Sequence, residues 1–286
     1  ANHNRWLEAQ VRVGSYDLDN THRVGSTPAG QSSYGTAVPL DDAPGVLRRA
    51  MWMQTSKQYR AASEALIKIN TSKEVQAQTA EERAPDFSRE QPHVFYGPEV
   101  SVRPDRKPWE DKVRLYTRAF RASPQILNSI VTFSAMGQNQ YQTTSEGTHL
   151  QFGQVHYRLE LFIQGKAPDG MDINRYYNFD WNNPSEAPDD KTVLAQGQVL
   201  RKELEALVAA PLVEPYAGPA LLTGRATAVF FHEVFGHRSE GFRQKDISEG
   251  QTFARKVGEQ ILPKFLSIYD DPTAKTLGKN MLLGYY

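Results

Sequence analysis

The sequence predicts an α+β fold in which mixed sheets are flanked by long helices. Short runs in which apolar residues alternate with polar ones are typical of half-buried strands. Other stretches carry apolar residues at helical spacing between helix-start and helix-stop residues. With 286 residues and 39% hydrophobic content, the chain is long enough for two or three domains with buried cores.

The first region, residues 1–105, is expected to hold one strand and one long helix. Apolar residues alternate with polar neighbours over 7–13, which predicts a half-buried strand. Acidic residues before Pro44 indicate a helix start, and the apolar stripe that follows predicts a helix over about 45–69. Prolines interrupt any period over 70–108, which indicates a loop or a domain linker.

The middle region, residues 106–210, combines predicted helices with predicted strands. Trp109 begins an apolar series at helical spacing that Pro124 ends, and a second helix opens at Pro188 and ends near Pro211. Between these helices a meander of three strands is expected, over residues 126–135, 155–164 and 173–180. We expect an aromatic cluster in the third strand to pack in a core, with a peptide cleft as the alternative. Its members are Tyr176, Tyr177, Phe179 and Trp181.

The composition argues against several functional classes. The formal net charge is +0, so no basic excess marks the chain for nucleic acid, and nucleic acid is not expected as a partner. Cysteine is absent, which excludes disulfides and thiolate metal ligands within these residues. No apolar run approaches the roughly 20 residues of a membrane span, so no membrane anchor is expected in this segment. Both ends look like interrupted elements and are expected to be cut.

The residues that point most directly to a chemistry are His232, Glu233 and His237. They lie in a predicted helix over 225–241, which Thr223 can cap and which follows a predicted short strand at 220–222. Metal-assisted hydrolysis needs neutral imidazole nitrogens that hold zinc and a carboxylate that takes a proton from water. The three residues therefore predict a hydrolytic metal site.

The five-residue spacing of the two histidines requires an irregular helix. Positions four apart lie roughly 40° apart around an α-helix, whereas positions five apart lie roughly 140° apart. A one-residue π-bulge brings positions five apart back to nearly one face, and Gly236 would tolerate the distortion. The motif thus predicts a π-bulge between His232 and His237.

The same residues also have a non-catalytic interpretation. Both histidines can be partly buried side chains that hydrogen-bond to carbonyls or carboxylates, with Glu233 solvated. Two histidines also leave a zinc site incomplete, because catalytic zinc commonly has three protein ligands and a water. Glu240, one turn beyond His237, is a candidate third ligand, a partner that orients a ligand, or a solvated surface group. These alternatives stay open at the level of the sequence.

Several blocks of the sequence resemble the TldD/PmbA family of metallopeptidases. They are Glu214 to Ala226, His232 to Gly241, Val257 to Glu259 and Tyr269 to Thr273. The resemblance covers most of the chain and is strongest after about residue 212. It implies that His232 and His237 bind Zn2+, that Glu233 is the catalytic base, and that a cysteine far downstream is the third ligand. No cysteine is present in these 286 residues.

The resemblance also implies an organisation and an activity. Residues 1–105 would be an incomplete N-terminal domain, 106–210 a middle α+β domain, and 211–286 the start of a β-rich C-terminal metallopeptidase domain that carries the zinc-binding helix. The implied activity is hydrolysis of unfolded or small peptides within a homodimer or a heterodimer with a TldE/PmbA-like subunit. The rival function is a non-catalytic peptide-binding or scaffold subunit of such a complex. The family default is cytoplasmic, and the expected absence of the true N-terminus leaves export open.

Overall fold

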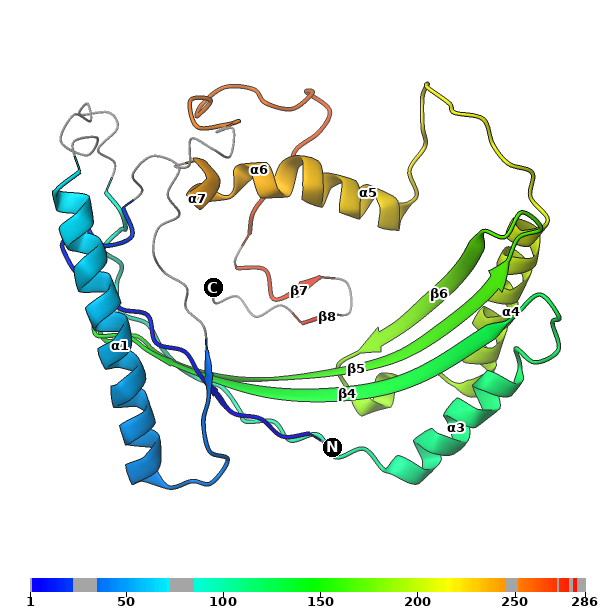
Figure 1. Cartoon of the computed structure of the whole chain (residues 1–286), viewed down its shortest axis with the longest axis horizontal. Coiled ribbons are helices and arrows are strands. Elements are labelled where there is room, and N and C mark those ends of the chain that lie inside the picture. The colour runs from blue at the N-terminus through cyan, green and yellow to red at the C-terminus, as the bar shows by residue number, and fades with distance from the viewer. Residues whose placement is uncertain are drawn as a thin grey trace. The chain divides into compact units, whose positions relative to one another are not determined.

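In the computed structural model of the chain, the described residues are 2–22, 35–72, 85–244, 252–271, 273–277 and 280–281. Contacts group the chain into two compact units, each described by itself below. One unit comprises Ala1–Glu90 and Pro219–Ser267, and the other comprises Gln91–Gly218 and Ile268–Tyr286. Helices and mixed sheets make up the described elements, which confirms the α+β class (Figure 1). The division into three domains stays a prediction.

The second unit is built on a four-stranded sheet around β5 (His149–Lys166). β4 (Asn128–Thr143) pairs antiparallel with β5 along its whole length. On the other side of β5, β6 (Asp172–Trp181) pairs antiparallel and β3 (Val94–Tyr96) pairs parallel, so the sheet is mixed. A separate two-stranded hairpin is formed by β7 (Thr276–Leu277) and β8 (Asn280–Met281).

The meander of three strands is present, but its strands are longer than the sequence predicts. β4 continues beyond the predicted end at residue 135 through Gln138, Asn139 and Gln140 to Thr143. These polar residues are exposed, because this part of the hairpin extends past the packed core. Without burial on one face, the alternation of apolar and polar residues disappears, and the sequence signal ends where the core ends.

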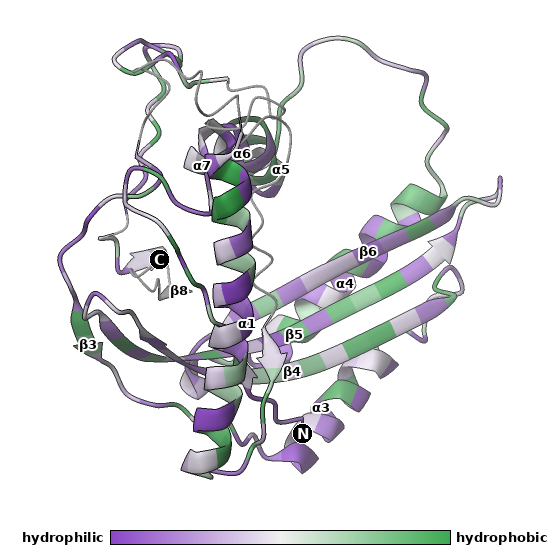
Figure 2. Ribbon diagram, turned by 60° about the vertical axis from the view of Figure 1, so that its left-hand side comes forward, coloured by the Kyte–Doolittle hydropathy of each residue, from purple (hydrophilic) through white to green (hydrophobic). Residues whose placement is uncertain are grey.

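Two helices cover one face of the sheet, in agreement with the predicted positions. α3 (Arg106–Arg118) begins after Asp105, which caps it, and α4 (Asp190–Val208) begins after Asp189, whose carboxylate accepts a hydrogen bond from the N–H of Thr192 at 2.7 Å. Successive strand residues point to opposite faces, and hydrophobic residues recur between hydrophilic ones along β5, β6 and the first half of β4 (Figure 2). The buried core comprises Tyr116, Phe120, Val131, Leu159, Leu161, Ile163, Trp181, Val193, Leu200 and Leu204.

The aromatic cluster of β6 divides between the two faces of the sheet. Trp181 belongs to the buried core, and Tyr177 and Phe179 pack against that core. Tyr176 lies on the opposite face and is 53% exposed. Core packing is thus confirmed for three of the four aromatic residues, and strand alternation explains the fourth.

The segment before α3, which we call the strap (residues 98–104), lies close against β4 and β5. A Cβ atom at Gly153 would come within 2.7 Å of the carbonyl oxygen of Pro98, and one at Gly137 within 2.8 Å of Val102 Cγ2. Real Cβ atoms do not approach other atoms so closely. Glycine at these two strand positions therefore lets the strap lie against the sheet.

The predicted linker over 70–108 is wrong at its C-terminal end. β3 lies within it and pairs with β5. The strap also bonds to the sheet, since the N–H of Val100 donates to Asn139 Oδ1 at 2.7 Å and Asn139 Nδ2 donates to the carbonyl of Val100 at 2.9 Å. A three-residue strand whose partner lies more than 50 residues away leaves no periodic signal in the sequence. Residues 73–84 of this linker lie outside the described residues.

In the first unit, β1 (Trp6–Leu7) pairs antiparallel with β2 (Thr36–Ala37). The strand predicted over 7–13 is wrong beyond its first residue. Exposure still alternates along these residues, but the N–H of Val13 donates to the side chain of Asn20 at 2.6 Å, and the Asn20 N–H donates to the Val13 carbonyl at 3.0 Å. The backbone therefore bonds within a local loop instead of a strand ladder.

The long helix predicted for the first unit is confirmed as α1 (Pro44–Asn70). Proline in its first turn suits a position where the backbone N–H has no helical partner. Only Ala62 and Ile69 of this helix are buried. Among the described residues, no helix combines the length and apolar content that a membrane crossing requires.

Candidate metal centre

The candidate site lies on an interrupted helical segment of the first unit. It begins with α5 (Gly224–Phe231), passes through the π-turn η2 (His232–Gly236), and continues as α6 (His237–Ser239) and α7 (Gly241–Gln244). The predicted helix is confirmed. Thr223 occupies the N-cap position, although its side chain makes no capping hydrogen bond.

The short strand predicted at 220–222 is wrong, because these residues form no strand. Leu221 is 99% exposed and Leu222 is 43% exposed. Their apolar character therefore does not come from a place in a sheet, and the segment is an extended lead into α5.

The π-turn that the histidine spacing predicts is present at the predicted place. The backbone N–H of His237 donates to the carbonyl oxygen of His232, which spans five residues instead of the four of an α-helix. The two imidazole rings consequently lie on one face of the segment, with centroids 4.5 Å apart and planes at 72°. An irregular turn thus does what a regular α-helix of this sequence would not do.

Glu233 completes the cluster with the two histidines. One of its carboxylate oxygens lies 3.9 Å from Nε2 of His232, and the other lies 3.9 Å from Nε2 of His237. These distances are too long for hydrogen bonds, and one candidate ligand atom from each residue lies within 4.8 Å of the others. The side chains of His232 and Glu233 are 64% and 62% exposed, and that of His237 is 33% exposed. The group is accessible to solvent, as a hydrolytic site must be.

Glu240 contacts His237 on the far side of the ring. Its Oε1 atom lies 2.8 Å from His237 Nδ1, which is the nitrogen that does not face Glu233. When Nδ1 carries the proton, Nε2 keeps its lone pair and can ligate a metal. Of the three roles open for Glu240, this geometry favours a partner that orients a ligand.

Arg243 is a site residue that the sequence reasoning missed. Its Nε atom donates to Glu240 Oε2 at 2.7 Å. The hydrogen bond from His237, and then that from Arg243, hold the pKa of Glu240 below its usual value. The three side chains form a chain of contacts that keeps the Glu240 carboxylate ionised. The spacing Glu240 to Arg243, three residues on one helical face, was the available signal.

The side chains of this group are of types that bind a transition-metal ion. Two imidazole nitrogens and a carboxylate are ligand types that such an ion accepts, and the oriented His237 ring adds the outer contact common at these sites. Within the described ranges, this is the one group that brings three potential ligand side chains together. The other described histidines lie elsewhere; His156, for instance, contacts Asp180 on β6 at 2.9 Å.

One family model matches the part of the chain that carries this group. Residues 216–282 match the family model described as the PmbA/TldA metallopeptidase C-terminal domain. The matched segment contains α5, the π-turn, α6 and α7, and therefore every residue of the candidate site. A search of curated proteins finds no match to the chain.

Proposed function

We propose, on the premise that residues 216–282 form a domain of the TldD/PmbA family, that this chain is the zinc-dependent peptidase subunit that hydrolyses small or unfolded peptides. The family domain supports a hydrolase of the metallopeptidase type, and the His-Glu-His group supports a bound metal. The observation that carries the proposal is the π-turn, which places His232, Glu233 and His237 around one point.

In this proposal the two histidines would hold the ion through Nε2, and Glu233 would move the proton of the attacking water. A bound zinc ion would supply Lewis acidity, which lowers the pKa of a coordinated water molecule to about 7. The Glu233 carboxylate lies between the two rings and makes no hydrogen bond to either, so it is available to accept the proton of the attacking water. It then donates that proton to the leaving amine of the peptide. Glu240 holds the His237 ring in the orientation that this arrangement needs.

The remainder of the metal site and the assembly are also part of the proposal. Two protein ligands are fewer than the three that catalytic zinc commonly has. We propose a cysteine outside these 286 residues as the third ligand, and a homodimer or a dimer with a TldE/PmbA-like subunit as the active assembly. The proposed substrates are extended or unfolded peptides.

Metal analysis combined with a point variant tests the proposal. The intact protein is purified, its zinc content is measured by mass spectrometry, and its hydrolysis of unfolded peptides is followed. Glu233→Gln should keep the zinc and lose at least about 100-fold in turnover, in line with the contribution of general bases. Glu214→Gln, which alters an exposed carboxylate outside the site, should behave like the wild type.

The same experiment decides between peptidase and scaffold. A protein that holds no zinc and binds peptides equally well as wild type and as Glu233→Gln would be a non-catalytic subunit. Full activity of Glu233→Gln with zinc bound would support the metal site but reject Glu233 as the base.

A further inference from the structure

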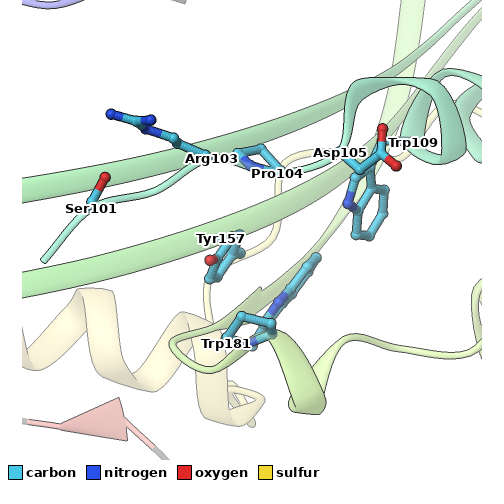
Figure 3. A pocket seen from close by; sticks show the side chains of 8 residues that line it. Ser101, Arg103, Pro104, Asp105, Trp109, Tyr157 and Trp181 are labelled. Atoms are coloured by element: carbon cyan, nitrogen blue, oxygen red, sulfur yellow. The ribbon is translucent and has the colours of Figure 1, made fainter.

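A pocket of about 470 Å³ lies in the sheet unit, between the strap, α3 and the strands. Its aromatic side chains already pack on one another, since the rings of Tyr157 and Trp181 stack with centroids 5.8 Å apart. The Arg103 side chain points away from these rings, and Asp105 lies beside Trp109 (Figure 3). The polar groups of this pocket do not converge on one point, so we assign no ligand to it.

The surface beside the candidate metal centre carries an apolar side chain that packing does not explain. Val229 belongs to α5, one helical turn before His232 and Glu233, and it is 61% exposed. An exposed valine is ordinary on a protein surface. Its place relative to the two candidate site residues gives this one a meaning.

Helix geometry places Val229 on the same face as His232 and Glu233. The helix is regular up to His232, whose N–H donates to the carbonyl of Ala228. Residues three and four positions apart therefore lie about 60° and about 40° apart around the axis, with Cβ atoms about 5–6 Å from each other. Side chains of a helix also lean toward its N-terminus, so those of His232 and Glu233 lean over the turn that carries Val229.

The other large apolar side chains nearby face elsewhere. Phe230 follows Val229 by one position, which turns it about 100° away, and its ring packs edge-on against Phe231 with centroids 5.6 Å apart. Val234 is turned away from Glu233 in the same manner. Ala226, three positions before Val229, is exposed and small, so it leaves room beside Val229 on the Glu233 side. Val229 is thus the large apolar side chain that a molecule at Glu233 would meet.

We propose that Val229 is a specificity-determining residue, which contacts the side chain that follows the scissile bond of the substrate and favours an apolar one. This inference rests on the proposed function, in which Glu233 donates a proton to the leaving amine. The leaving amine belongs to the residue after the scissile bond, so that residue must lie at Glu233. Its side chain can then bury apolar surface against Val229.

The residues found at newly formed N-termini test the proposal. The intact protein digests a mixture of unfolded peptides, and mass spectrometry identifies each cut. Apolar residues should be enriched after the cut, and Val229→Asn should lower kcat/KM at these bonds, relative to bonds before polar residues, at least about threefold. Val229→Leu should keep the preference. An active wild type without such a preference, or a preference unchanged in Val229→Asn, would overturn the proposal.

Val46→Asn is the matched control. Val46 is also an exposed helical valine, at 49% exposure, and it belongs to α1. This variant should cut as the wild type does. An equal loss of preference in Val46→Asn and Val229→Asn would show that the effect does not come from the site and would reject the assignment.

Peptide binding without turnover separates this inference from the proposed function. Two labelled hexapeptides, Ser-Leu and Ser-Asn each repeated three times, are titrated by fluorescence polarisation into the Glu233→Gln protein. The leucine peptide should bind at least about threefold more tightly, and adding Val229→Asn should remove most of this difference. An inactive wild type with this binding preference would reject the peptidase but keep Val229 as a peptide contact. Equal binding of the two peptides, or no binding of the leucine peptide, would overturn the inference even for an active enzyme.

Discussion

The backbone N–H of His237 donates to the carbonyl oxygen of His232, and this single five-residue hydrogen bond brings their side chains to one face. In a regular α-helix the two rings would diverge by roughly 140°. π-turns often occur at functional sites, and this one brings two candidate metal ligands together. The turn brings the two histidines together through backbone geometry, so it should not require a particular residue between them.

A substitution at Gly236 tests whether the turn requires glycine. Its backbone has ordinary helical dihedrals, φ −53° and ψ −59°, and the nearest atom to a Cβ there would be the Phe231 carbonyl oxygen at 3.7 Å. The turn therefore does not require glycine at this position, contrary to the expectation from the sequence. Gly236→Ala should keep the metal affinity of the intact protein within about threefold, a change below about 0.7 kcal/mol. Loss of zinc in a competition titration would mean that the turn depends on glycine.

Glu240 offers a sharper test of the site. Glu240→Gln removes the negative charge that accepts the His237 Nδ1 hydrogen bond, so the ring loses its fixed orientation and part of its basicity. Metal affinity of the intact protein should fall about 10- to 100-fold. A chromophoric chelator in competition measures this affinity.

Glu259→Gln is the matched control for Glu240→Gln, because Glu259 is exposed and lies outside the cluster. A full loss of zinc in Glu240→Gln would point instead to direct ligation by Glu240. An affinity equal to that of the control would assign Glu240 to the surface.

The site could be predicted from the sequence to the extent that chemistry fixes spacing. Two histidines that share a metal must share a face. At a spacing of five positions only a π-turn does this in a helix, so the irregularity could be deduced. The contact of Arg243 with Glu240 depends on side-chain rotamers beyond the end of the motif. The three-residue spacing allows the contact, but the side-chain rotamers decide whether it forms.

The fold could be predicted where burial of one face in a core gives the sequence a hydrophobic period. The long helices and the buried halves of β4, β5 and β6 meet that condition. β3 and the strap do not, because their places depend on partners far along the chain and on the absent side chains of Gly137 and Gly153. Residues 7–13 show the opposite case. Their exposure alternates as in a strand, but beyond Leu7 they have no partner strand in the β1–β2 pairing and form no strand.

Asp190 should make the stability of the sheet unit depend on pH. Its carboxylate accepts hydrogen bonds from Lys112 Nζ and from the hydroxyl of Tyr116, both at 2.5 Å. These contacts, that of Lys112 first, lower the pKa of Asp190. A lowered pKa stabilises the fold above the unfolded value of about 3.9, and this stabilisation is lost as the pH falls from there through the folded pKa.

The size of the Asp190 contribution follows from its exposure. The side chain is 48% exposed, so solvent screening limits the contribution to about 0.5–1 kcal/mol. In urea unfolding between pH 6 and pH 2, Asp190→Asn should be less stable than the wild type at pH 6 and should lose less stability on acidification. Asp172→Asn, an exposed carboxylate of the same unit, controls for net charge. Parallel curves for Asp190→Asn and wild type would contradict the prediction.

Tyr116 should act at the other end of the pH scale. Burial, followed by the hydrogen bond to Asp190, raises the pKa of its hydroxyl. An acid with a raised folded pKa contributes stability that is present below its unfolded pKa of about 10 and is lost as the pH rises above it. The free energy of unfolding should therefore fall above about pH 10, and less so in Tyr116→Phe. An identical alkaline decline in the variant would show that other groups cause it.

Gly153 should not accept a side chain without a shift of the strap. A Cβ there would lie 2.7 Å from the Pro98 carbonyl oxygen and 2.8 Å from Val100 Cγ1, so Gly153→Ala must push the strap away from β5. Overpacking of this kind costs about 1–3 kcal/mol, measurable by urea unfolding. Gly224→Ala, where a Cβ would meet nothing within 4 Å, should be nearly neutral. A Gly153→Ala variant as stable as the wild type would show that the strap is free to move.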